Sequence, residues 1–319
     1  MTRPALVGDI GGTNARFALV TPGEFDLQHI ETLACADYTH LDDAVSAYLD
    51  KVGGDAPTEA CLAFACPVHD DDIRMTNNPW HFGKRDMKSR LGLENFKVIN
   101  DFTAMALGLP HIDDNDLVRV GDGRSEPGRA RLVMGPGTGL GMAGLAPSQR
   151  YWIPLSAEGG HAGFAPTDDV EIALLQWLRV RYGRVSIERV LCGQGLLDLY
   201  HALCEFEGVE ASLDSPAAIT DAARDGNEMS RRTVMQFCRI LGHVAGDAAL
   251  TLGARGGVYL CGGILPRILD MLQESEFRTA FADKGRMSPY NADIVTWVVT
   301  AKWTGLLGAA EALHNEEVS

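Results

Sequence analysis

The sequence predicts an α/β protein built from two similar domains. Three observations predict this fold: two glycine-rich turns that each stand between apolar strands, and a strand that leads through a Gly-Gly pair into a helix. These features occupy residues 6–20, 131–146 and 256–272. The length of 319 residues suits two domains of ordinary size.

The first glycine-rich turn joins two apolar strands. Its glycines, within residues 8–12, permit tight turns and close approach of a ligand. Thr13 and Asn14 add groups that hydrogen-bond phosphate oxygens. The stretch is neither a P-loop, because no lysine follows the glycines, nor a dinucleotide fingerprint, because the spacing differs and a strand follows. Taken alone, a structural hairpin in which Asp9 serves the turn explains it equally well.

A second glycine-rich turn repeats this layout. Residues 131–146 place an apolar strand before glycines and a threonine, and a strand of small residues after them. Thr138 follows Thr13 by 125 residues, a spacing of a whole domain and too long for a solenoid repeat. We therefore expect a duplicated α/β domain. Two facing hairpins would hold a nucleotide polyphosphate in the cleft between the domains.

The third glycine site is the pair Gly262 and Gly263, which follows the apolar strand "VYLC". Such a pair exposes backbone to close approach of a flat or sugar-like group. On its own it is better explained by a simple strand–turn–helix. Following two phosphate hairpins, it is interpreted as an adenosine contact.

Asn100 and Asp101 stand at the end of an apolar strand, residues 96–99. A carboxylate at a strand end beside a phosphate loop is placed to act as general base toward an alcohol. Asn100 can donate to and accept from a sugar hydroxyl. An isolated Asn-Asp pair is more often a turn or a helix cap.

Three further polar residues suit the same site. Glu158 and His161 flank two glycines, which implies a loop from which both side chains reach a cleft. They could be metal ligands, but no third and fourth ligand stands nearby in the sequence. Glu188 follows Ser186, a candidate helix cap, where a carboxylate is favourable. A set this rich in acceptors suits a neutral polyol better than an anion.

These segments together resemble the hexokinase–actin–acetate kinase superfamily, and most closely its bacterial ATP-dependent glucokinase family. The resemblance rests on "VGDIGGTNARFAL", "INDFTA", "GTGLG", "EGGH", "ERVLCG" and "GGI", and it runs from Ala5 to about Leu313. It implies two similar ribonuclease H-like domains of the actin-like ATPase fold with an interdomain cleft. The small α/β domain would span 1–110, completed by a C-terminal helix at 301–319, and the large one 111–300. The related zinc-bearing sugar kinases and repressors carry clustered cysteines, whereas Cys192 stands alone here.

The resemblance also implies an activity and a site. The chain would phosphorylate glucose at O6 with Mg-ATP, giving glucose 6-phosphate and ADP, with Asp101 as the catalytic base. The sugar would bind Asn100, Asp101, Glu158, His161 and Glu188. ATP would bind Gly8, Asp9, Ile10, Gly11, Gly12, Thr13, Gly137, Thr138, Gly139, Gly262 and Gly263. Asp9 would hold Mg²⁺, through water.

Composition excludes other function classes. A net charge of −15 argues against nucleic acid or anionic membrane as a partner. Seven cysteines without a C-x-x-C pair indicate buried free thiols in a reducing cytoplasm, and neither a signal peptide nor a membrane span is visible. We expect a cytoplasmic homodimer. The alternatives are a kinase of the same fold for another hexose or amino sugar, and a non-enzymatic sugar sensor. A sensor would need a DNA-binding segment before the first strand, which starts near residue 5.

Overall fold

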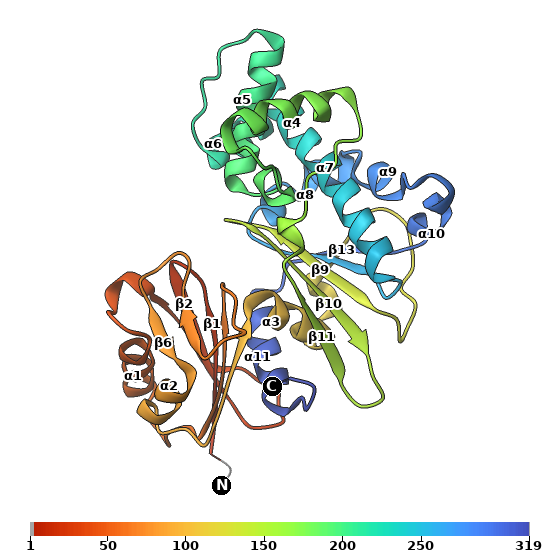
Figure 1. Ribbon diagram of the computed structural model, residues 1–319. Coiled ribbons are helices and arrows are strands. Elements are labelled where there is room, and N and C mark those ends of the chain that lie inside the picture. The colour runs from red at the N-terminus through yellow and green to blue at the C-terminus, as the bar shows by residue number, and fades with distance from the viewer. Residues whose placement is uncertain (1–2, 319) are drawn as a thin grey trace. The chain divides into compact units, whose positions relative to one another are not determined.

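The computed structural model describes residues 3–318 and contains helices and sheets in two compact units (Figure 1). Unit 1 comprises the chain up to Asp114, Leu145–Ser156 and the chain from Ala301 on. Unit 2 comprises Asn115–Gly144 and Ala157–Thr300. The segment Leu145–Ser156, which the sequence analysis gives to the second domain, therefore groups with unit 1. Each unit is described by itself below.

Unit 1 is built on a five-stranded sheet with the order β3-β2-β1-β4-β7. β1 and β2 are antiparallel, as are β2 and β3, whereas β4 runs parallel to β1 and β7 parallel to β4. The predicted strand–turn–strand at the first glycine-rich turn is confirmed. The strands are β1 (Ala5–Ile10), β2 (Asn14–Val20), β3 (Gln28–Ala34), β4 (Glu59–Phe64) and β7 (Asn95–Asn100), and a separate hairpin pairs β5 (Asp72–Arg74) with β6 (His81–Gly83).

A second sheet has six strands in the order β11-β10-β9-β12-β13-β8. β12 is parallel to both β9 and β13, and β8 is an antiparallel edge strand. In both sheets three consecutive strands stand side by side, and the first of them neighbours a later parallel strand. This shared order supports the predicted duplication. The strands are β8 (Leu117–Arg119), β9 (Arg131–Pro136), β10 (Leu140–Pro147), β11 (Trp152–Ala157), β12 (Val258–Leu260) and β13 (Thr296–Val299).

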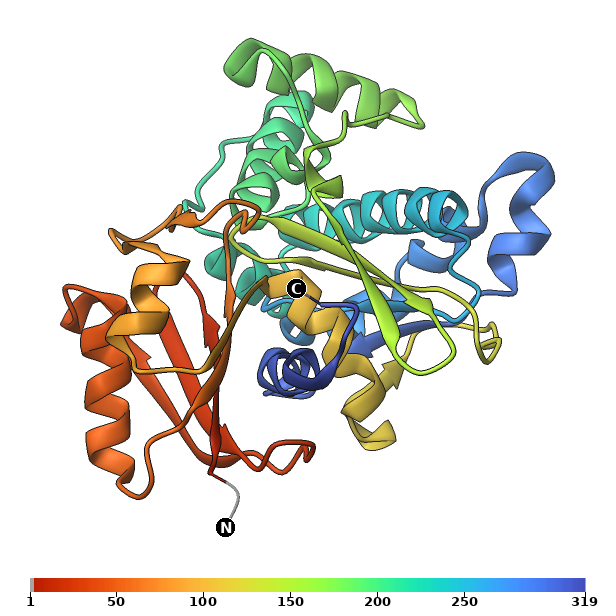
Figure 2. The same cartoon turned by 60° about the horizontal axis from the view of Figure 1, so that its bottom comes forward.

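Two helices of unit 1, α3 (Asp101–Gly108) and α11 (Thr304–His314), lie side by side in Figures 1 and 2. Glycines let their backbones touch, because a Cβ on Gly308 would lie 1.7 Å from the Ala104 carbonyl oxygen and one on Gly108 2.1 Å from the Thr304 oxygen. Lys97 closes the far end of α11: its Nζ donates to the carbonyl oxygens of residues 312, 315 and 318 at 2.7–3.0 Å. The other helices of unit 1 are α1 (Leu41–Val52) and α2 (Lys84–Arg90).

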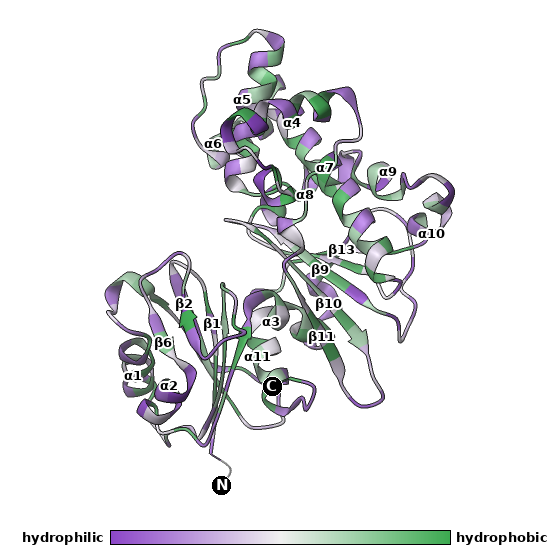
Figure 3. Ribbon diagram, in the orientation of Figure 1, coloured by the Kyte–Doolittle hydropathy of each residue, from purple (hydrophilic) through white to green (hydrophobic). Residues whose placement is uncertain are grey.

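The long helix of unit 2, α7 (Glu228–Leu252), shows how packing follows the sequence pattern. Val234, Phe237 and Leu241 recur on one face and are fully buried, and Gly253 ends the helix with a φ of 65°. Figure 3 shows green hydrophobic and purple hydrophilic residues in turn along α7, while green predominates in the strands. The other helices are α4 (Asp169–Tyr182), α5 (Gly193–Glu207), α6 (Pro216–Arg224), α8 (Leu269–Glu274), α9 (Phe277–Ala282) and α10 (Ser288–Ala292).

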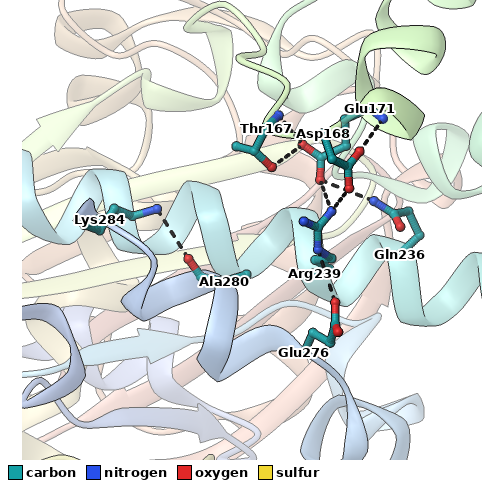
Figure 4. A network of polar contacts seen from close by, with 8 residues as sticks. All are labelled: Thr167, Asp168, Glu171, Gln236, Arg239, Glu276, Ala280 and Lys284. Atoms are coloured by element: carbon teal, nitrogen blue, oxygen red, sulfur yellow. Dashed lines mark hydrogen bonds and ion pairs between the residues drawn. The ribbon is translucent and has the colours of Figure 1, made fainter. Parts of the chain in front are cut away.

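A buried carboxylate fixes α4 against α7. Glu171 is 1% exposed, and it accepts hydrogen bonds from the Thr167 amide and hydroxyl and from Gln236 (Figure 4). Arg239 of α7 lies 3.1 Å from Glu171 and also pairs with Asp168 and Glu276. A buried charge is tolerated when it is paired and hydrogen-bonded, as Glu171 is here.

Two expectations from composition bear on the fold. All seven cysteines are buried free thiols, and burial raises the pKa of Cys61 and of Cys238 to about 12. Among residues 3–318, no helix combines the length and the apolar character that crossing a membrane requires.

Candidate functional site

The first glycine-rich turn carries a paired carboxylate. Asp9 of β1 faces Arg16 of β2 across the hairpin, with Asp9 Oδ2 3.0 Å from Arg16 Nη1. Burial raises the pKa of Asp9, and the Arg16 guanidinium opposes that rise. A Cβ on Gly305 would lie 3.2 Å from the Asp9 carboxyl carbon, so the first turn of α11 packs against this carboxylate. The positive end of a helix favours an anion there.

Hydrogen bonds from neighbouring residues fix the backbone of this turn at Gly11. The Gly11 amide donates to Asn14 O at 2.9 Å, while the Gly11 carbonyl accepts from Asn78 Nδ2 at 3.4 Å and Cys35 Sγ at 3.6 Å. A Cβ on Gly12 would lie 2.6 Å from the Asn77 Cβ, which explains the glycine. The Gly11 carbonyl is therefore engaged by the protein itself.

The predicted nucleotide residues of β1 fall into two groups. Gly11 and Gly12 are partly exposed and Thr13 is exposed, so they are accessible to a ligand. Gly8 and Ile10 are buried within β1, where a Cβ on Gly8 would lie 2.6 Å from a Leu62 methyl carbon. Gly8 and Ile10 therefore shape the strand, and their contact with a nucleotide stays a prediction.

Asn100 and Asp101 stand where β7 gives way to α3. Asn100 caps the helix: its Oδ1 accepts from Phe102 N at 2.9 Å and Thr103 N at 3.3 Å, and its Nδ2 donates to Cys66 O. Asp101 Oδ1 also accepts from Phe102 N at 2.9 Å. Ile10, Phe64 and Asn100 are in register, so Asp101 and the first turn share one edge of the sheet. Two strand spacings separate them, about 10 Å.

The second glycine-rich turn joins β9 to β10. The Gly137 amide donates to Gly139 O at 2.8 Å, and the Gly137 carbonyl accepts from the Gly193 amide at 2.9 Å. Thr138 is exposed, and a Cβ on Gly137 would meet nothing within 4 Å, so this side of the turn is open. The Leu140 amide donates to Glu188 Oε2 at 2.9 Å.

Unit 2 brings Glu158, His161 and Glu188 together. His161 Nε2 lies 4.0 Å from Glu158 Oε2, and His161 Nδ1 lies 3.9 Å from Glu188 Oε1. Ser186 caps the short 3-10 turn Ile187–Arg189 that carries Glu188, as the sequence predicts. The side chains of Glu158 and His161 are 60% and 63% exposed, against 30% for Glu188.

The third glycine site lies beside the second turn. A Cβ on Gly262, whose φ is 93°, would lie 2.5 Å from the Pro136 carbonyl oxygen, whereas one on Gly263 would meet nothing within 4 Å. β9 and β12 are parallel neighbours, so their carboxyl ends meet at one edge of the sheet. Ligands of α/β proteins bind at such edges.

Comparisons with known proteins show the family of the chain. The model of the family described as glucokinase matches residues 6–316. The chain belongs to the glucokinase family. A glucokinase of Chromohalobacter salexigens is 65% identical over 319 residues, which cover 100% of both chains. A glucokinase of Hahella chejuensis is 57% identical over 315 residues, covering 98% of each.

Solved structures extend the likeness to the fold. A glucokinase from an Antarctic psychrotroph matches with a TM-score of 0.90 at 40% identity, covering 98% of this chain and 99% of its own. A ROK family glucokinase from Streptomyces griseus, solved with glucose and AMPPNP, shares the fold at a TM-score of 0.65 and 19% identity, covering 98% and 99%. As a member of the glucokinase family, the chain is an enzyme, a sugar kinase.

The possible metal ligands of this glucokinase-family chain fit a Mg²⁺ ion that binds together with the phosphates of a nucleotide. Within residues 3–318, no group of three or more His, Cys, Asp or Glu side chains gathers around one point. Mg²⁺ in phosphate sites is bound by one or two carboxylates together with phosphates and water. Asp9 supplies one such carboxylate at the first turn, and a cation would relieve the cost of its burial.

Three residues of the site escaped the sequence-based prediction. Arg16 is part of the first glycine-rich segment. Pairing the two strands of this hairpin places Arg16 opposite Asp9, so the strand register could have identified the pair. Asn78 and Gly305 contact the first turn from 67 and nearly 300 residues away, and no local pattern marks them.

Proposed function

We propose that this glucokinase-family enzyme transfers the γ-phosphoryl group of ATP to O6 of glucose, giving glucose 6-phosphate and ADP, the first step of glycolysis. One observation carries the proposal: unit 2 places the cluster of Glu158, His161 and Glu188 directly beside a glycine-rich turn. Hydroxyl-binding groups and a phosphate-binding backbone thereby meet, as a sugar kinase requires.

Asp101 would act on the attacking hydroxyl. As O6 attacks the γ-phosphorus, Asp101 accepts the O6 proton, the bond between the γ-phosphorus and the bridging oxygen breaks, and its electrons pass to ADP. Asn100 holds the start of α3 through its Oδ1, which leaves an amide hydrogen of Nδ2 for a sugar hydroxyl. Glu158, His161 and Glu188 would bind the remaining hydroxyls.

The glycine-rich turns would bind ATP through backbone amides. Gly11, Gly12 and Thr13 would contact phosphates from unit 1, and Gly137, Thr138 and Gly139 from unit 2. Gly262 and Gly263 would contact adenosine. Amides that converge on a turn form anion-binding sites at little cost in conformational freedom.

Mg²⁺ bound with ATP would neutralise part of the phosphate charge. Asp9 would hold this ion, through water, because Arg16 occupies one side of its carboxylate. We further propose the actin-like arrangement of two ribonuclease H-like domains, 1–110 with 301–319 and 111–300, and a cytoplasmic homodimer.

ADP release measured with a panel of sugars tests the proposal. Glucose should give the highest kcat/KM among glucose, mannose, fructose and glucosamine. A higher kcat/KM for another sugar would overturn the glucose assignment, and binding of glucose without ADP release would indicate a sensor.

A further inference from the structure

Glu188 makes contacts that sugar binding does not explain. Its Oε2 accepts the Leu140 amide at 2.9 Å, and Leu140 is the first residue after the second glycine-rich turn. A Cβ on Gly139 would lie 2.4 Å from the same oxygen, so Gly139 leaves the space that this carboxylate fills. This hydrogen bond to a side-chain acceptor fixes the direction of the Leu140 amide.

The other oxygen of Glu188 faces the sugar residues. Oε1 lies 3.9 Å from His161 Nδ1, and His161 continues the cluster toward Glu158. One carboxylate therefore has an oxygen on each side: Oε2 on the phosphate turn and Oε1 on the sugar cluster.

The loop that carries His161 packs on the same residue of the turn. A Cβ on Gly160 would lie 2.2 Å from the Leu140 carbonyl oxygen, so the two backbones are in contact. Leu140 is thus held through its amide by Glu188 and through its carbonyl by the sugar loop. A displacement of Glu188 or of the sugar loop therefore acts on the same residue, Leu140.

We infer that Glu188 is a positioning residue for ATP as well as a sugar ligand, and that it couples the two binding events. This inference rests on the proposed function. Glucose bound at Oε1 restricts the carboxylate, which holds the turn in the conformation that binds phosphate. Because coupling is reciprocal, bound ATP strengthens glucose binding through the same carboxylate.

Two substitutions at Glu188 separate the roles. Glu188→Gln keeps an oxygen that can accept the Leu140 amide and loses the charge. Glu188→Leu has a similar volume and no acceptor. Glu158→Leu is the matched control, because Glu158 faces the sugar cluster and has no contact with the turn among the described hydrogen bonds.

The measurement is the affinity of the purified full chain for AMPPNP with Mg²⁺, by calorimetry, with and without saturating glucose. Without glucose, Glu188→Leu should bind AMPPNP roughly five- to tenfold more weakly, because the binding-competent turn is less populated. Glu188→Gln and Glu158→Leu should stay within about twofold of the wild type. Glucose should tighten AMPPNP binding about fivefold or more in the wild type and hardly at all in Glu188→Leu.

Each outcome decides one point. Equal AMPPNP affinity for Glu188→Leu and the wild type overturns the positioning role, even if glucose affinity falls. Equal losses in the Gln and Leu variants also overturn it, since the retained acceptor would then be irrelevant. Unchanged glucose affinity in Glu158→Leu would instead count against the sugar assignment of the proposed function.

Discussion

Gly160→Ala adds a single methyl group but should lower kcat/KM for glucose strongly. The new Cβ would lie 2.2 Å from the Leu140 carbonyl oxygen, and real Cβ atoms essentially never approach closer than 3.0 Å. The φ of Gly160 lies outside the left-handed region, so the cost is steric and not conformational. The loop must move by most of an ångström, taking Glu158 and His161 with it.

The expected loss follows from that displacement. A misplacement of about 1 Å can cost on the order of 10²-fold in rate, so kcat/KM for glucose should fall by about 10- to 100-fold. Overpacking should also cost about 1–3 kcal/mol of unfolding free energy. The assay is ADP release at saturating ATP with varied glucose, together with urea denaturation.

Two neighbouring glycines provide controls. A Cβ on Gly159 would meet the Met142 sulfur at 2.5 Å, and this flexible side chain can move aside, so Gly159→Ala should be milder. A Cβ on Gly163 would meet nothing within 4 Å, so Gly163→Ala should be close to wild type. If all three variants lose the same activity, or if Gly160→Ala retains full kcat/KM, the packing argument is refuted.

Three further predictions follow from the site and the core. Asp101→Asn should lower kcat by roughly 10²-fold or more with little change in glucose affinity, and retention of a tenth of the activity would remove Asp101 from the role of base. Arg16→Met removes the cation that opposes the burial-raised pKa of Asp9, so that pKa should rise further. In its proposed role at Mg²⁺ Asp9 acts in the ionised form, so the acid limb of kcat/KM for ATP should shift to higher pH, and an unshifted profile would contradict this. Arg239→Leu leaves the buried Glu171 without its cation and should cost about 3–5 kcal/mol in urea denaturation. Adding Glu171→Gln should recover part of that loss, and a double variant less stable than the single one would argue against the ion pair.

Local features of the site could be predicted from the sequence. Glycine-rich turns, the apolar face of α7 and the Ser186 cap are each set by residues within a few positions of one another. Such signals need no knowledge of the tertiary structure. The repeat at 125 residues predicts a duplicated α/β domain, and the order of the five strands in the first sheet recurs in the second, which adds β8 at its edge.

Contacts between distant segments could not be predicted in this way. Glu188 and Leu140 are 48 residues apart in the sequence. The sequence motif around Glu188 does not indicate that Oε2 accepts a hydrogen bond beside the second glycine-rich turn. The exposure of the sugar-binding side chains could not be predicted either: Glu158 and His161 are 60% and 63% exposed. Polar residues in a glycine-rich loop lie on the protein surface unless another segment of the chain covers the loop. The local sequence does not show whether such a segment exists.

The origin of α11 has a consequence for synthesis of the chain. This helix packs on β1, β4 and α3, and Lys97 of β7 binds its last carbonyl groups, although almost 190 residues separate α11 from the first part of unit 1. A ribosome needs on the order of ten to forty seconds to add that many residues. During that interval the amino-terminal sheet has been made but lacks the helix that covers one of its apolar faces, while unit 2 is being completed. The nascent chain therefore depends on protection from aggregation, and truncation after residue 303 should leave a product that cannot finish folding.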